Sequence, residues 1–261
     1  MRLPGNIELN HAFAIWMRNF TVYRHTWKMN ILPNFFEPVF YLLAMGIGLG
    51  LYVNRDIDGM GYLEFLAPGL LAAAAMNGAV FESTYNMFIK MNFSRVYEAY
   101  LTTPAELPDI AFGELMWAVT RSMIYGICFL LVLLGFTIAG RPILSSWWAL
   151  LLPLVIPLIG AMFALIGQLF TSLIRAIDLY SYFYTLGITP LFLFSGTFFP
   201  LQGTLQTVAV CTPLYHCVQL TRDLAHGRVG LHDLASLAYI VVVIAVLMVV
   251  VPRRMRVRMV Q

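Results

Sequence analysis

The chain has 261 residues, of which 60% are hydrophobic and 11% are charged, and its formal net charge is +3. Soluble domains have about 25% charged residues, so this composition excludes an ordinary water-soluble globular fold. The apolar runs are long and do not alternate with polar residues, which favours membrane-spanning helices over barrel strands. We therefore expect an all-α polytopic membrane protein whose residues 1–261 form a single transmembrane domain.

The first predicted element is a helix over residues 7–30. Its aromatic side chains recur at spacings of three and four, which places them on one helical face: Phe13, Trp16, Phe20, Tyr23 and Trp27. An aromatic face with basic flanks is typical of a helix that lies in the headgroup plane, although a soluble helix packed on a partner is the alternative. No apolar core follows a basic start, so a secretory signal is not expected. Pro33 and Pro38 mark the turn into the first span.

Six charge-poor runs are long enough to cross about 30 Å of hydrocarbon as helices. The predicted spans are residues 35–53, 64–84, 116–138, 147–172, 179–198 and 233–251. The charge-free run 179–221 is too long for one span, but Pro200, Gly203 and Pro213 interrupt its second part. We therefore expect residues 199–223 to form re-entrant helices rather than a seventh span.

Lysine and arginine residues predict the orientation of these spans. Six spans place both termini on one side, which then holds eleven basic residues: Arg2, Arg18, Arg24, Lys28, Lys90, Arg95, Arg175, Arg253, Arg254, Arg256 and Arg258. The other side holds four: Arg55, Arg141, Arg222 and Arg228. Because cytoplasmic loops are enriched in basic residues, we expect both termini in the cytoplasm and the chain in a bacterial inner membrane.

The connection between the second and third spans is predicted to hold a short cytoplasmic helix at residues 94–104. Tyr97 and Leu101 are four residues apart and would share a helical face, and Pro104 disfavours further helix at Thr103. We expect an apolar knob on the cytoplasmic surface that docks a partner protein, with an ordinary solvated loop as the alternative. The members of this docking surface are Arg95, Tyr97, Glu98, Leu101, Thr103 and Pro104.

Several enzyme classes are disfavoured by the sequence. Neither lysine belongs to a G-x-x-x-x-G-K-[ST] motif, so we expect no nucleotide or other cofactor on this chain. The histidines are scattered and lie outside the predicted spans, which disfavours a metal site and an intramembrane serine protease. Cys211 and Cys217 would lie about 9 Å apart on one helix, so free thiols are expected. An ion-coupled carrier is weakened because Glu82 and Asp178 lie near span ends rather than at mid-depth.

A substrate pathway is suggested by the aromatic residues of the fifth span, because aromatic rings stack on sugars and tolerate lipid chains. An ordinary interfacial aromatic belt is the alternative. Asn77 and Gln168 are the polar groups at mid-span. The candidate pathway residues are Asn77, Gln168, Tyr180, Tyr184, Phe192, Phe194, Phe198 and Phe199.

The order of these features resembles the membrane subunit of type-2 ABC exporters. Residues 98–104, EAYLTTP, are similar to the family's E-x-L-L-x-T-P pattern, with Tyr100 in a leucine place. Residues 194–200, FSGTFFP, together with TPLYH at 212–216 and Arg222-Asp223, resemble the family's carboxy-terminal signature. These last pieces are most similar to the NodJ-like branch, which is linked to export of lipo-oligosaccharides. After residue 200 the family's leucine–proline pair and tryptophan are absent, so the re-entrant connector is shortened.

The resemblance implies a permease subunit that pairs with a second permease, most simply as a homodimer, and with two separate ATPase subunits that hold ATP and Mg. In this scheme Tyr97 and Leu101 anchor the ATPase, Glu98 adds a polar contact and Pro104 holds the connector rigid. The implied substrate is a glycolipid, a lipo-oligosaccharide or a polysaccharide-like amphipath, moved out of the cytoplasm or inner leaflet. A drug-efflux permease, an ion-coupled carrier and a structural membrane scaffold are the alternatives. Membrane lipid is an expected partner, and nucleic acid is not.

Overall fold

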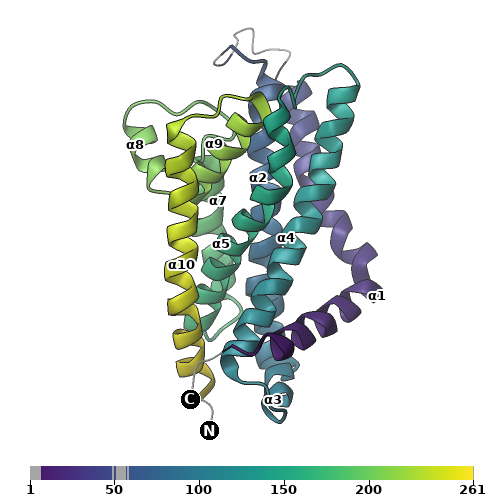
Figure 1. Ribbon diagram of the computed structural model, residues 1–261, viewed down its shortest axis with the longest axis vertical. Helices are drawn as coiled ribbons and strands as arrows, with labels where there is room; N and C mark the ends of the chain where they lie inside the picture. The colour runs from purple at the N-terminus through teal and green to yellow at the C-terminus, as the bar shows by residue number, and fades with distance from the viewer. Residues whose placement is uncertain (1–6, 49, 51–56, 58, 261) are drawn as a thin grey trace.

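The computed structural model describes residues 7–48, 50, 57 and 59–260, with the side chains of 28–35 and 259–260 outside that description. Within the described residues the chain is a bundle of helices that forms no β-strand, and the pairing of Ile57 with Met60 is an isolated bridge. The predicted all-α class is confirmed. Figure 1 shows the beginning of the first helix and the end of the last helix at one end of the bundle, which we call the terminal end.

Helix α1 (Leu9–Tyr41) continues without a break into the π-helical segment η1 (Leu42–Gly48). The sequence predicted a separate interfacial helix and a first span, but the structure joins them in one bent helix (Figure 1). Pro33 and Pro38 lie inside this helix, where a proline removes a backbone donor and favours a bend instead of a break. Residues 49 and 51–53 of the predicted span lie outside the described residues.

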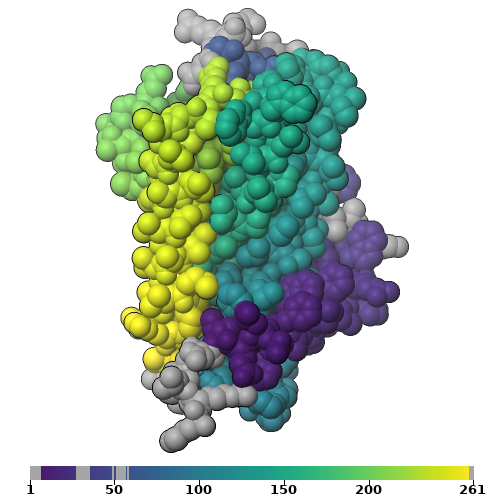
Figure 2. Space-filling model, viewed as in Figure 1, coloured from purple at the N-terminus to yellow at the C-terminus, as the bar shows by residue number. Residues whose placement is uncertain are grey.

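The first part of α1 lies across the terminal end of the bundle (Figure 2). Ala12, Ile15, Asn19 and Tyr23 form its buried face. On the other side the predicted aromatic stripe is partly confirmed, because Phe13, Trp16 and Phe20 stack with centroid separations of 5.2 and 5.6 Å. Tyr23 instead belongs to the buried face, where its ring meets Trp117 edge-on at 5.4 Å.

Helix α2 lies at the centre of the bundle. It begins at Tyr62, runs as an α-helix to Phe81 and continues through the π-helical segments η3 (Glu82–Asn86) and η4 (Ile89–Phe93). The alanine run 72–75 is fully buried, and these small side chains let neighbouring helices approach closely. Two further long helices, α4 (Leu107–Ile138) and α5 (Leu152–Leu173), pack on α2, and a third, α10 (Leu231–Val260), packs on α5 and α4.

Four apolar helices are long enough to cross a membrane. They are Tyr62–Phe93, Leu107–Ile138, Trp147–Leu173 and Leu231–Arg258, and they correspond to the second, third, fourth and sixth predicted spans. The first predicted span contributes the shorter apolar stretch Phe36–Gly48. The fifth is divided into α6 (Leu179–Tyr182), η6 (Phe183–Ile188) and α7 (Thr189–Leu193), so it ends earlier than residue 198.

The segment after α7 turns back at the end of the bundle opposite the termini (Figure 1). It contains α8 (Thr204–Val210) and α9 (Pro213–His226), within the predicted re-entrant range 199–223 extended by three residues. The α9 helix packs against α2 and α10, and it buries Leu214, Cys217 and Val218. Both Cys211 and Cys217 are free, as the spacing predicted.

Candidate functional site

A short helix, α3 (Val96–Leu101), lies at the terminal end between α2 and α4 (Figure 1). It begins after Arg95, whose φ of +48° is left-handed and reverses the chain out of the preceding helix. It ends because Thr102 and Thr103 donate side-chain hydrogen bonds to the carbonyls of Ala99 and Tyr100, at 2.8 and 2.6 Å. The predicted helix at 94–104 therefore forms, with a turn in place of its last residues.

The two faces of α3 differ from the prediction. Leu101, Glu98 and Arg95 are exposed, with Leu101 at 42%, and Thr103 and Pro104 are exposed beside them. Tyr97 is only 1% exposed, so its placement on a surface knob with Leu101 is corrected. The Tyr97 ring lies under α3, where it stacks with Tyr100 at 6.2 Å. Tyr97 therefore anchors α3 to the bundle, and the surface available for docking is formed by the other five predicted residues.

A cluster of buried charges lies next to this anchor. Lys90 Nζ contacts Glu82 Oε1 at 2.9 Å and Glu114 Oε2 at 2.8 Å, and all three side chains are at most 15% exposed. Arg121 Nε lies 3.5 Å from Glu82 Oε2. We call Glu82, Lys90, Glu114 and Arg121 the buried charge cluster. Its two positive and two negative groups balance, which is the condition for burying charges at tolerable cost.

The buried charge cluster joins elements that are distant in sequence. Asn19 of α1 donates to Glu114 at 3.1 Å, and Asn86 donates to Glu82 at 2.8 Å. The Arg121 guanidinium lies 4.4 Å from the ring centre of Tyr23 on α1. Burial and the nearby Glu114 carboxylate raise the pKa of Tyr97 well above its ordinary value, so its hydroxyl stays neutral. The cluster thus connects α1, α2 and α4 directly beneath α3.

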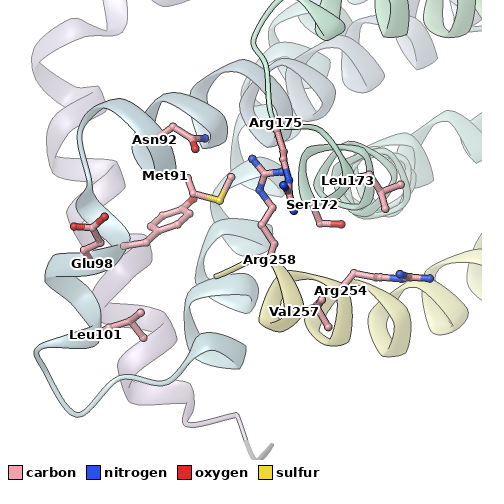
Figure 3. Close-up of a pocket in the computed structure, with 11 residues that line it drawn as sticks. Met91, Asn92, Glu98, Leu101, Ser172, Leu173, Arg175, Arg254, Val257 and Arg258 are labelled. Atoms are coloured by element: carbon pink, nitrogen blue, oxygen red, sulfur yellow. The ribbon is translucent and has the colours of Figure 1, made fainter. Parts of the chain in front are cut away.

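An open cleft of about 580 Å³ lies beside α3 at the terminal end. Glu98 and Leu101 border it on the α3 side, and Arg175, Arg254 and Arg258 border it from the ends of α5 and α10 (Figure 3). The cleft therefore pairs an exposed apolar side chain with a basic wall. These are the features that a protein partner with an acidic segment would recognise.

A second cavity, of about 300 Å³, lies between α1, α2 and the helical stretch formed by η6 and α7. We call it the membrane cavity. It brings together three predicted pathway residues, Asn77, Tyr184 and Phe192. The Phe192 ring also meets Phe198 and Tyr41 edge-on, at 4.9 and 6.1 Å, which gives the cavity an aromatic wall.

The other predicted pathway residues lie elsewhere. Gln168 is buried and donates to the Ala111 carbonyl at 3.2 Å, so it joins α5 to α4. Tyr180 is fully buried, and its hydroxyl lies 2.8 Å from that of Thr171. Phe194 and Phe199 are partly exposed on the turn after α7 and do not line the cavity. Three of the eight predicted residues therefore line the membrane cavity and Phe198 contacts one of them, while the remaining four lie elsewhere; the role of any of them in a pathway stays a prediction.

Sequence reasoning missed Glu37, which lines the membrane cavity. The signal was available, because Glu37 directly precedes Pro38 at the start of an otherwise charge-free run. The turn expected at Pro33 and Pro38 would have placed it at the edge of the first span. The continuous α1 helix places it inside the bundle's apolar length instead.

The carboxy-terminal motif residues form a structural joint at the opposite end. Gly196 has a φ of +79°, and its carbonyl accepts a hydrogen bond of 2.8 Å from Arg222 of α9. The same guanidinium lies 3.8 Å from the ring centre of Phe65 and donates to the Phe65 carbonyl at 3.2 Å. A Cβ at Gly69 would lie 2.9 Å from Thr197 Cγ2, so glycine is needed there for close packing. These motifs therefore attach the re-entrant segment to α2.

The described residues also bring Asp223, His232 and Asp233 together, with ligand atoms within 4.8 Å, where the sequence predicted no metal site. Asp233 Oδ2 accepts from the Gly230 amide at 2.8 Å and so caps α10. His232 Nε2 lies 2.9 Å from Asp223 Oδ2. Helix capping and a histidine–carboxylate contact account for this arrangement.

Comparison with known proteins places the chain in a family. The family model for ABC-2 type transporters matches residues 10–226. The chain is 36% identical over 239 residues to Nodulation protein J of Rhizobium meliloti (strain 1021), with 88% of each chain covered. It is 37% identical over 232 residues to Nodulation protein J of Rhizobium leguminosarum bv. trifolii, covering 87% of this chain and 84% of the relative.

A more distant relative is the Inner membrane transport permease YadH of Escherichia coli (strain K12), which is 24% identical over 220 residues, with 84% of this chain and 83% of the relative covered. No solved structure matches. The family match and the relatives both extend over most of the chain, and the four long apolar helices agree with a membrane location. The chain therefore belongs to the ABC-2 type transporter family, as a membrane-embedded transport subunit.

Proposed function

We propose that this chain is the permease of an ATP-driven exporter that moves an amphipathic, sugar-bearing substrate out of the cytoplasm or inner leaflet. One observation carries the proposal: the exposed face of α3 is connected to the membrane cavity through buried side chains. Tyr97 holds α3 on the bundle, the buried charge cluster lies beneath it, and that cluster contacts α1 and α2. Both of those helices line the membrane cavity.

In this proposal the energy comes from a separate subunit. Two ATPase subunits hold ATP and Mg, and each docks on the α3 of one permease through Leu101, Glu98 and the neighbouring exposed residues. A second permease copy faces the open side of the membrane cavity. Both termini and α3 lie in the cytoplasm, and the excess of basic residues predicted for the terminal end supports this orientation. Six spans then include the two shorter apolar stretches around the cavity.

The substrate class is supported by the lining of the membrane cavity. Aromatic rings at Tyr41, Tyr184 and Phe192 offer stacking surfaces, and Asn77 offers hydrogen bonds. The names of the relatives as nodulation proteins agree with export of a lipo-oligosaccharide. A drug-efflux permease is the second candidate, because the same aromatic wall would accept an apolar drug. An ion-coupled carrier would need no ATPase.

The docking step is tested with Leu101→Asp. The permease and its ATPase would be co-expressed, purified together and reconstituted in liposomes, and ATP-dependent export of a fluorescent glycolipid would be measured. We expect Leu101→Asp to reach the membrane but to lose ATPase co-purification and export. The control is Leu231→Asp, which is also exposed but begins α10 at the opposite end, where an acidic residue is favourable. Normal export by Leu101→Asp would refute the docking role, and export without any ATPase would favour the carrier.

A further inference from the structure

Glu37 lies at mid-depth in the apolar part of the bundle. Gly46 of the same helix packs against Leu63, close to the start of α2. Glu37 is nine residues before Gly46, which is roughly 14 Å along a helix. On the facing helix the cavity residues Ala73 and Ala74 lie a similar distance beyond Leu63. If the start of α2 marks one edge of an apolar core about 30 Å thick, Glu37 lies close to the middle of that core.

A carboxylate at this depth needs a polar surrounding. Charged groups inside membranes face a bundle interior or a water-filled path, because contact with hydrocarbon is costly. Glu37 is an exposed residue of the isolated chain, and it borders the membrane cavity. Its position therefore indicates that the open side of the cavity faces a polar pathway instead of lipid.

The charge of the cavity lining is one-sided. Among the described residues that line it there is no lysine, arginine or histidine, and Glu37 is the one carboxylate. The other polar groups are the Asn77 amide, the Tyr41 and Tyr184 phenols and the Thr189 hydroxyl. A carboxylate accepts hydrogen bonds from hydroxyl groups, and it repels an anion strongly where the dielectric constant is low. Aromatic rings beside such a group complete the features that bind an uncharged sugar.

We propose that Glu37 is the specificity-determining residue of the membrane cavity, where it accepts hydrogen bonds from the hydroxyl groups of an uncharged sugar headgroup and excludes anionic headgroups. This inference rests on the proposed function, since it assigns the membrane cavity to the substrate. It also adds to that function, because the aromatic lining alone does not discriminate by charge.

The test uses the full complex of permease and ATPase in liposomes. Two fluorescent lipids with identical acyl chains are compared: one has a glucosyl headgroup, and the other has the same glucose carrying a sulfate. We expect the wild-type complex to export the uncharged lipid roughly thirtyfold faster, which corresponds to two unit charges about 8 Å apart at an effective dielectric constant of about 20. Glu37→Gln should bring this ratio close to one, and Glu37→Asp should largely preserve it.

The control for net charge is Asp178→Asn, which removes a carboxylate that does not line the cavity and should leave the ratio unchanged. Three outcomes overturn the inference: an unchanged ratio in Glu37→Gln, a wild-type ratio near one, or preferred export of a lipid with a cationic headgroup that Glu37→Gln abolishes. If Glu37→Gln fails to fold, the wild-type export ratio still tests the inference, because a ratio near one overturns it. ATP-dependent export of the uncharged lipid alongside any of these outcomes would leave the proposed function standing. Failure of the wild-type complex to export any lipid would refute the proposed function itself.

Discussion

Removing the Lys90 ammonium group should destabilise the protein more than removing any exposed charge. Its Nζ lies 2.9 Å from Glu82 and 2.8 Å from Glu114, and both carboxylates are at most 4% exposed. In Lys90→Met the two buried carboxylates keep one positive partner within the cluster, Arg121, whose Nε lies 3.5 Å from Glu82 Oε2. Breaking a buried ion pair on one side costs about 3–5 kcal/mol. For a chain of this size that lowers the unfolding midpoint by roughly 6–20 °C.

The measurement is thermal unfolding of the purified permease in one detergent. Arg95→Met is the control, because its contact with Glu98 is exposed and long at 4.0 Å and should contribute less than about 1 kcal/mol. Arginine and methionine have the same energetic cost in the left-handed backbone conformation at position 95, so this cost cancels in the comparison. Lys90→Met with Glu114→Gln restores charge balance and should recover most of the lost stability. Equal midpoints for Lys90→Met and Arg95→Met, or no recovery in the double variant, would show that the cluster is not a balanced unit.

Three further predictions concern packing. Gly69→Ala should lower the free energy of unfolding by about 1–3 kcal/mol, since the added Cβ would lie 2.9 Å from Thr197 Cγ2. Gly135→Ala has open space around the added Cβ and should be neutral or stabilising. The thermal unfolding midpoints of the two variants are compared. Arg222→Met should cost roughly 2–4 kcal/mol in the same assay, because two buried carbonyls lose their donor, and an unchanged midpoint would contradict the joint described for it. Tyr97→Phe should change the free energy of unfolding by less than about 1 kcal/mol and preserve export, while Tyr97→Ala should lower it by about 3–5 kcal/mol. If a stable Tyr97→Phe bound the ATPase poorly, Tyr97 would belong to the docking surface after all.

The sequence predicted the features that follow from the thickness and apolar nature of the bilayer. Long apolar runs predicted four spans that the structure has as helices, and Pro200, Gly203 and Pro213 predicted the broken segment at the opposite end. The positions of the spans can be predicted from local sequence, because each helix in lipid must satisfy its own backbone hydrogen bonds. The count of six stays a prediction, since the other two apolar stretches are shorter.

The site depended on contacts that sequence spacing does not reveal. Tyr97 and Leu101 are four residues apart on the short helix α3, yet Tyr97 is buried against the bundle and Leu101 is exposed. Lys90 and Glu114 belong to different helices and meet only in the fold. Gln168 was expected in a pathway and instead joins two helices. A mid-span polar residue alone therefore does not distinguish a pathway from a helix contact.

The most direct test of the central claim measures motion at the membrane cavity in response to the ATPase. Spin labels at Phe40 and Leu186, both exposed on α1 and η6, would report their separation in the reconstituted complex. With ATP and vanadate the wild-type distance distribution should shift, and Leu101→Asp, reconstituted with separately purified ATPase subunit that hydrolyses ATP, should show no shift. An identical shift in Leu101→Asp, or no shift in a wild-type complex that exports lipid, would contradict the account.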